Sequence, residues 1–243
     1  MRIDRVLFPL PFITVAFSLT CYGQNRPDFD ASRLMTGTFH YRDHLEGTSD
    51  GHSVIRIEKI SGGVTYAFSN VVTGSFSQHW RALTTKDFTP VSAELTFGNG
   101  AAAKKVFSLS YQTGHVTGFL VKEPRVADSV SRPVDDAVAP DTVDQRVDWA
   151  SVMSLKEYIP SKRFLLHVYD PKTGNSAVEA TVMSLETIHV DAGTFHVARI
   201  VYQIRKSTGS ERFEVFVNDS LPRFLVKEVF PNGLISELAV NTP

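Results

Sequence analysis

The residues of this sequence that could do chemistry are a serine motif, a set of histidines and a scatter of carboxylates. Gly47-Thr48-Ser49-Asp50-Gly51 has the G-x-S-x-G form that holds the nucleophilic serine of many hydrolases. That serine must stand on a turn between a strand and a helix, whereas the residues after Gly51 alternate in the manner of a second strand. We therefore interpret the motif as a hairpin loop and predict no nucleophile there.

The histidines raise the question of a metal site. They are His40, His44 and His52, with Asp43 among them, and later His189 and His196. On a strand, His40 and His44 share a face but stand about 13 Å apart, too far to bind one ion through ligands at about 2 Å. Only a bend near Arg42 would bring them together. The later pair flanks a turn without a cysteine or a second carboxylate, so we predict no metal at either place.

Paired carboxylates could hydrolyse a glycosidic bond, but that chemistry depends on their separation in space, which the sequence does not give. Four glutamates mostly alternate with apolar neighbours, as on the outer side of a strand: Glu94, Glu179, Glu214 and Glu228. We predict that these side chains face solvent. No catalytic residues and no cofactor are predicted.

One short helix is predicted among the strands. Asp148 is a suitable cap for a helix over residues 149–158, and Pro160 would end it. Its apolar residues fall on one face, which is typical of a helix that covers a sheet. If the protein binds a ligand, the candidate residues are Trp80, Trp149 and Met153.

Strand patterns position these residues along most of the chain. The clearest is Ile188–Arg205, where a strand, an Asp-Ala-Gly turn and a long alternating strand follow one another. Similar segments recur every eight to twelve residues or so, joined by turns rich in Gly and Asn. We predict an all-β fold, a large antiparallel β-barrel-like or curved two-sheet structure with one short helix. A final strand over 234–240 is expected to tie the C-terminal residues into a sheet.

Length and composition are compatible with one large β domain. The 243 residues include 17 Phe, and 42% are hydrophobic, enough to fill a core. We predict a single β-rich domain over 24–243. The stretch 122–148 contains Pro124, Pro133 and Pro140 without a sustained period, so it is predicted to be a long loop between two halves. The 25 basic and 26 acidic residues form no cluster of one sign, which argues against nucleic acid as a partner.

Residues 1–23 have the layout of a secretory signal peptide. Arg2 and Arg5 precede an apolar run over 6–19, which ends in small and turn-forming residues. A spanning helix needs about 20 apolar residues, so we predict export to the periplasm or cell envelope and no integral membrane protein once the signal is removed. Lipid anchoring through Cys21 is the alternative, but the residues before it fit a lipoprotein signal poorly.

Several short pieces together resemble a known family. They are Tyr41, Trp80 before Pro90, Val147-Asp148-Trp149-Ala150-Ser151, Arg163-Phe164-Leu165-Leu166, Val190-Asp191-Ala192-Gly193-Thr194-Phe195, and Leu221-Pro222 before the last hairpin. In order and spacing the chain is similar to DUF3108, a family of bacterial envelope proteins without an assigned activity. The resemblance implies an exported, mostly β protein, and it carries over no catalytic residues.

The function predicted from these observations is that of a non-enzymatic exported envelope protein. Its partner would be a lipid-like or other apolar ligand, or another envelope component, because a curved sheet with a helix at its mouth offers an apolar cleft. Two alternatives stay open. One is a periplasmic hydrolase that uses an acid pair or a histidine cluster, and the other is a structural or assembly partner that acts through a sheet edge.

Overall fold

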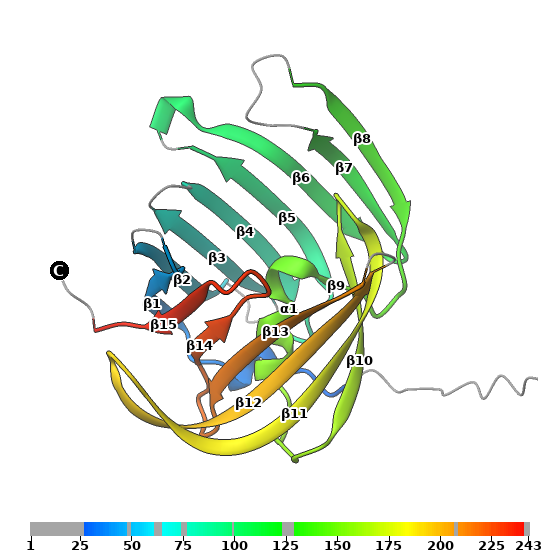
Figure 1. Ribbon diagram of the computed structural model, residues 1–243. Coiled ribbons are helices and arrows are strands. Elements are labelled where there is room, and N and C mark those ends of the chain that lie inside the picture. The colour runs from blue at the N-terminus through cyan, green and yellow to red at the C-terminus, as the bar shows by residue number, and fades with distance from the viewer. Residues whose placement is uncertain are drawn as a thin grey trace, which may run out of the picture.

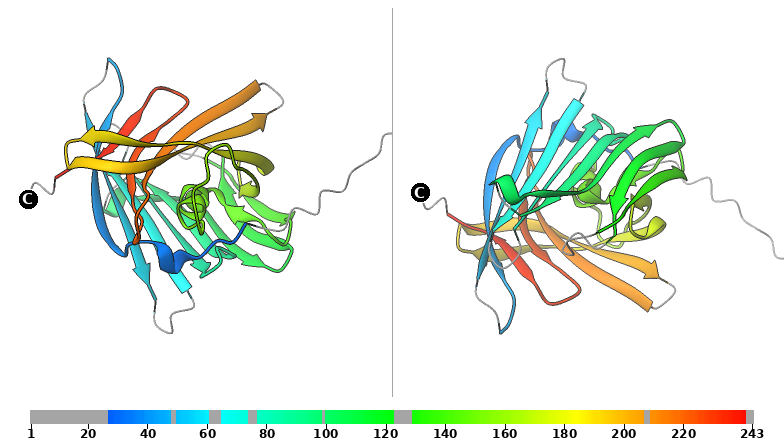
Figure 2. Two further views of the ribbon diagram at one scale, coloured as in Figure 1. Left: turned by 90° about the horizontal axis from the view of Figure 1, so that it is seen from below. Right: turned by 90° about the horizontal axis from the view of Figure 1, so that it is seen from above.

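A computed structural model of the chain describes residues 27–47, 50–60, 65–73, 77–98, 100–122, 129–206 and 209–240. The predicted signal peptide and Cys21 lie outside these ranges. The described residues form one sheet of 15 strands, antiparallel except for the parallel pair β9–β10, that curls around an interior, with a short helix inside the curve (Figures 1 and 2). The predicted all-β class is confirmed, and its form is a single curved, barrel-like sheet rather than two sheets.

The first half of the sheet contains the strands β1 (Gly37–His44), β2 (Gly51–Lys59), β3 (Thr65–Thr73), β4 (Gln78–Thr85), β5 (Pro90–Phe97), β6 (Lys104–Gln112), β7 (His115–Val121) and β8 (Ser131–Ala137). The second half contains β9 (Val143–Asp144), β10 (Arg163–Asp170), β11 (Gly174–Val190), β12 (Gly193–Lys206), β13 (Gly209–Asn218), β14 (Leu225–Val229) and β15 (Ile235–Leu238). The helical elements are η1 (Ala31–Arg33), η2 (Gly100–Ala102), η3 (Gln145–Val147) and α1 (Asp148–Met153). No helix within the described ranges has the length and apolar character that crossing a membrane requires.

The alternation predicted from the sequence decides which side chains enter the interior. On β2, Ser53, Ile55 and Ile57 are buried, while His52 and Arg56 are exposed. The strand after the Asp-Ala-Gly turn is confirmed as β12, and its buried side chains on the predicted face are Ile200, Tyr202 and Ile204. Inward residues from most of the strands form one large hydrophobic core.

The two halves of the sheet are joined by β15. The strand order runs β2-β1-β15-β14-β13, so β15 pairs with β1 from the start of the chain and with β14 just before it. Ser236 lies opposite Asp43 of β1 on one side and opposite Glu228 of β14 on the other. The prediction that the C-terminal strand is tied into a sheet is confirmed.

The two ends of the sheet approach one another without pairing as strands. Tyr169 near the end of β10 donates a hydrogen bond to Asp136 of β8 at 2.6 Å, and the Asn175 amide donates to the carbonyl of Ala137 at 2.9 Å. The Arg132 guanidinium donates to the carbonyl of Pro171. Side chains therefore hold the seam, and the strand ladder stays open there.

The prediction of one long loop over 122–148 is wrong for much of that stretch, because β8, β9 and η3 lie within it. β8 is an edge strand that pairs with β7, with Phe119 opposite Pro133. Proline lacks a backbone N–H, which a strand tolerates at an edge. Pro133 therefore gave the sequence of β8 the character of a loop, although the segment is a strand.

The predicted helix is shorter than expected. α1 begins at Asp148 and ends at Met153, and the chain then continues in turns to Tyr158, whose hydroxyl donates to the Met153 carbonyl at 2.7 Å. Arg223, just before β14, also donates to the carbonyls of Met153 and Leu155. These bonds satisfy carbonyls that the short helix leaves unpaired and fix it inside the curve.

Deletion of Ser236–Pro243 should strongly destabilise the protein, because it removes most of β15 and separates β1 from β14. We expect the melting temperature to fall by roughly 10 °C or more, since each lost ladder hydrogen bond is worth about 1 kcal/mol. Circular dichroism melting would measure the change. Deletion of residues 241–243 alone is the control and should have little effect, and equal melting temperatures for both deletions would contradict the joining role of β15.

Candidate functional site

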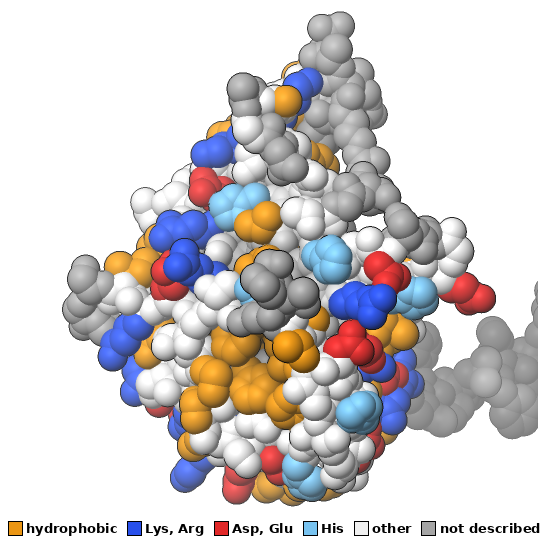
Figure 3. Space-filling view, turned by 90° about the vertical axis from the view of Figure 1, so that its left-hand side faces the viewer, with side chains coloured by type: hydrophobic (Ala, Val, Ile, Leu, Met, Phe, Trp, Pro, Cys, Tyr) orange, Lys and Arg blue, Asp and Glu red, His pale blue; other side chains and the backbone are white. Residues whose placement is uncertain are grey.

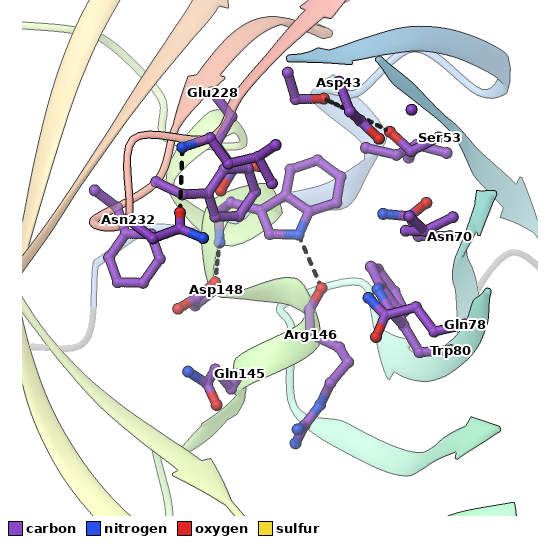
Figure 4. Close-up of a pocket in the computed structure, with 18 of the residues that line it drawn as sticks. Asp43, Ser53, Asn70, Gln78, Trp80, Gln145, Arg146, Asp148, Glu228 and Asn232 are labelled. Atoms are coloured by element: carbon purple, nitrogen blue, oxygen red, sulfur yellow. Dashed lines mark hydrogen bonds between the residues drawn. The ribbon is translucent and has the colours of Figure 1, made fainter. Parts of the chain in front are cut away.

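A cavity of about 560 Å³ lies within the curve of the sheet. Strands β1 to β5 line one side, β12 to β15 with the β14–β15 turn line another, and η3 and α1 complete the wall (Figure 4). Its apolar lining includes Ile55, Val72, Trp80, Trp149, Phe213 and Phe230. A volume of this size is typical of small-molecule sites, which lie between about 300 and 1,000 Å³.

Two of the three residues predicted to bind a ligand line this cavity. Trp80 comes from β4 and Trp149 from the first turn of α1, and the indole N–H of Trp149 donates to the Arg146 carbonyl at 2.8 Å. An edge-on contact with Phe68 further fixes the Trp149 ring. Met153 is completely buried in the core and is absent from the cavity lining. α1 has fewer than two turns, and its last residue, Met153, lies in the packed interior.

Asp43 brings the first carboxyl group to the cavity. It lies on the inward face of β1, with Tyr41, and is 8% exposed. Ser53 and Ser236 donate hydrogen bonds to its Oδ1 at 3.0 and 2.7 Å. Burial raises its pKa, because desolvation outweighs the stabilisation of the charged form by these two hydroxyls.

Asp148 contributes a second carboxyl group from α1. The sequence predicted it as the residue before the helix, whereas it is the first helical residue and Val147 occupies the cap position. Its carboxylate accepts the backbone N–H of Trp149 at 2.6 Å. Burial raises its pKa to about 7, despite the opposing effects of this hydrogen bond and of Arg146.

Glu228 contributes the third carboxyl group to the cavity. The prediction that its side chain faces solvent is wrong. It lines the cavity, while its neighbour Lys227 forms an ion pair with Glu237 at 2.7 Å. Alternation shows that Lys227 and Glu228 face opposite sides of β14 but not which side is the interior. Burial, followed by the nearby negative charges of Asp148 and Asp43, raises the pKa of Glu228 to about 8.

Among the described residues, the one cation in the lining is Arg146 of η3, which acidic partners bind behind the wall. Its guanidinium donates to Asp144 at 2.5 Å and to Asp170 at 2.6 Å. Asp144 is fully buried and also accepts the Tyr111 hydroxyl. This network links η3 to the neighbouring strands and leaves the cavity with more acidic than basic groups.

The histidines bind separate partners. His44 pairs with Asp50 at 2.8 Å and His196 with Asp219 at 2.7 Å, while His189 lies 3.0 Å from the Thr194 hydroxyl. In the parts of the chain that the structure describes, no group of three ligating side chains could hold a metal ion. Figure 3 shows histidines spread among charged side chains around a hydrophobic patch. Ser49 of the G-x-S-x-G motif lies outside the described residues, and β2 follows it, as predicted.

Sequence reasoning singled out the aromatic half of the lining and missed its carboxyl groups. One signal was available, because Asp43 stands two residues after Tyr41 and so shares a strand face with a large apolar side chain. Glu228 had no comparable signal. Its inward position follows from the pairing of β15 with β1, which joins segments far apart in the sequence.

Comparisons with known proteins yield remote structural likenesses only. No family model matches the sequence, and no curated protein matches it. Among solved structures, the chain is similar to a β-barrel-like protein of the domain of unknown function DUF1849 from Brucella abortus, at 8% identity and a TM-score of 0.49, covering 83% of this chain and 94% of that one. A second likeness is to a DUF1089 family protein from Pseudomonas aeruginosa, at 10% identity and a TM-score of 0.40, covering 79% and 90%.

The raised pKa of Glu228 predicts a specific pH dependence of stability. Between the ordinary pKa of about 4.5 and the folded value of about 8, the folded protein binds more protons than the unfolded chain, so stability falls as the pH rises through this range. Glu228→Gln cannot ionise. We expect its melting temperature, measured by calorimetry, to equal that of the wild type at pH 5 and to be about 5 °C higher at pH 8.5.

Glu94→Gln is the matched control, because Glu94 forms an exposed ion pair with Lys105 at 3.0 Å. It should leave the difference in melting temperature between pH 5 and pH 8.5 unchanged. If Glu228→Gln and the wild type lose stability in parallel over this range, Glu228 does not have a raised pKa.

Proposed function

We propose that this chain is a non-enzymatic protein of the bacterial cell envelope that holds an apolar or amphipathic small molecule inside its curved sheet. The observation that supports the proposal is the cavity of about 560 Å³ between β1–β5 and β12–β15. Rings and branched aliphatic groups make up much of its wall, and a few polar groups converge on it, which is the usual composition of a small-molecule site.

Contacts within the protein fix parts of the cavity wall without a ligand. Trp149 is held by a hydrogen bond and a ring contact, and the carbonyls at the end of α1 are bound by Arg223. A site that is already rigid loses little conformational freedom on binding, so more of the interaction energy is available as affinity. These contacts favour a binding protein with a defined ligand shape.

A second candidate function is hydrolysis by a carboxyl pair, favoured by Asp148 and Glu228. Carboxyl groups with pKa values of about 7 and about 8 in a cavity could act as general acids near neutral pH. A panel of chromogenic glycosides and esters would test this. Turnover that Glu228→Gln abolishes and Glu94→Gln preserves would support it, and a rate no higher than buffer would eliminate it for these substrates.

Action through a sheet edge is less well supported. β8 is the edge of the first half, and its residues Asp136 and Ala137 accept hydrogen bonds from Tyr169 and Asn175 across the seam. A strand added along that edge would have to displace these contacts. The interior cavity therefore carries the proposal.

Export is part of the same proposal and is supported by the signal-like sequence of residues 1–23. Membership of DUF3108, whose motifs the chain resembles, would be consistent with it. We expect protein recovered from the periplasmic fraction of a bacterial host to have the intact mass of residues 24–243. A mass that begins at Cys21 and carries acyl chains would support lipid anchoring, and recovery of the uncleaved chain from the cytoplasm would contradict export.

Binding in the cavity can be tested with N-phenyl-1-naphthylamine, a neutral dye whose fluorescence rises in apolar surroundings. We expect saturable binding to the wild type. Val72 of β3 lines the cavity, so Val72→Phe fills part of it and should weaken binding about tenfold or more.

The matched control is Val71→Phe, because Val71 is the preceding residue on β3 and is 37% exposed. It adds the same ring outside the cavity and should leave dye binding unchanged. Equal weakening by both substitutions, or no saturable binding to the wild type, would contradict the proposed site.

A further inference from the structure

Resting on the proposed binding function, we infer that the ligand is an organic amine. Its ammonium group would lie among Asp43, Asp148 and Glu228, and its apolar body against Trp80, Trp149 and the neighbouring rings. The inference concerns the charge and hydrogen-bonding character of the ligand, which the shape of the cavity alone does not determine.

Two of the three carboxyl groups, those of Asp43 and Glu228, meet because of the strand pairing. Asp43, Ser236 and Glu228 form one row across β1, β15 and β14, and side chains in such a row share a face of the sheet. Asp148 approaches the row from α1, and it is close enough for its charge to affect the ionisation of Glu228. Figure 4 shows all three acidic residues around the same space.

Two acceptors at the cavity wall make no hydrogen bond with a described residue. Glu228 makes no side-chain hydrogen bond with a described residue, and the buried side-chain oxygen of Asn70, also in the lining, has no hydrogen-bond partner among them. Leaving a buried acceptor without a donor is unfavourable. An ammonium group supplies up to three N–H donors, so it can satisfy both of these acceptors.

Positive charge in the wall would oppose this match, but the single cation that the described residues place there is already neutralised. The Arg146 guanidinium contacts Asp144 and Asp170, and its Cζ lies 4.7 Å from the centroid of the Phe107 ring. An anionic ligand would have to compete with two carboxylates for Arg146 while facing three further carboxyl groups. The charge distribution therefore favours a cation over an anion.

The aromatic residues support the same choice. Trp80, Trp149, Tyr202, Phe213 and Phe230 line the cavity, and the faces of aromatic rings attract cations. These rings also bury an apolar body well. A carboxyl cluster between aromatic walls can therefore bind both parts of an aryl- or alkylamine.

Amine binding should also release protons. At pH 7.5 a carboxyl group with a pKa of about 8 is largely protonated, and a neighbouring ammonium group favours its ionised form. The titratable and charged groups facing Glu228 are Asp43, Asp148 and the hydroxyls of Tyr41 and Tyr202, with Arg146 beyond Asp148. We expect a substantial fraction of one proton to pass from the site to the buffer for each amine bound.

Three probes with the same apolar body test the inference: 4-phenylbutylamine, 4-phenylbutanol and 4-phenylbutyrate. Isothermal titration calorimetry at pH 7.5, in two buffers of different ionisation enthalpy, gives both affinity and proton release. We expect the amine to bind about tenfold or more tightly than the alcohol, and the carboxylate to bind most weakly. Glu228→Gln should lower amine affinity about tenfold and remove most proton release, with alcohol affinity unchanged, whereas Glu94→Gln should change neither.

The neutral dye separates failure of this inference from failure of the proposed function. If the dye binds but the amine binds no better than the alcohol, or the carboxylate binds best, the amine inference is overturned and the cavity function stands. If neither the dye nor any probe binds, both are overturned. Dye binding by Glu228→Gln shows that the variant is folded, so a loss of amine affinity in it reports on the carboxyl group.

Discussion

The pairing of β15 with both β1 and β14 is the interaction on which the rest of the structure depends. Without it, the described strands would form two separate sheets, β1 to β8 and β9 to β14. The same pairing builds the cavity, because Ser236 lies between Asp43 and Glu228 and its hydroxyl donates to Asp43. One short strand thus determines both the continuity of the sheet and the position of two of the three acidic groups in its interior.

The seam at the opposite side of the sheet is held by polar side chains and not by strand pairing. Tyr111, Asp144, Arg146 and Asp170 form a buried polar network, and Tyr169 extends the contact to β8. Buried ion pairs contribute little net stability compared with apolar packing, but removing one partner leaves an uncompensated charge at a cost of about 3 to 5 kcal/mol. The network therefore specifies how the curled sheet meets itself, while the hydrophobic core supplies most of the stability.

Local patterns in the sequence predicted the elements of this fold but not their long-range arrangement. The turn before Gly193, the alternation through Tyr202 and the C-terminal strand follow from rules that act over a few residues. The strand containing Pro133 was missed because a proline usually argues against a strand. It is compatible with a strand at the edge of a sheet, and the sequence does not show that β8 is an edge. At the site, Trp80 and Trp149 line the cavity, as predicted. The positions of Glu228 and Met153 were predicted wrongly. Tertiary packing determines which face of β14 is inward and where α1 ends, and the sequence does not show either.

The place of β15 in the chain also has a consequence for the order of events in biosynthesis. β15 follows every other described strand, so the ribosome produces both halves of the sheet before the strand that connects them. Contacts between distant segments form slowly because chain entropy must be lost before they are made. The interior between the halves therefore takes its final shape only after translation has passed Leu238.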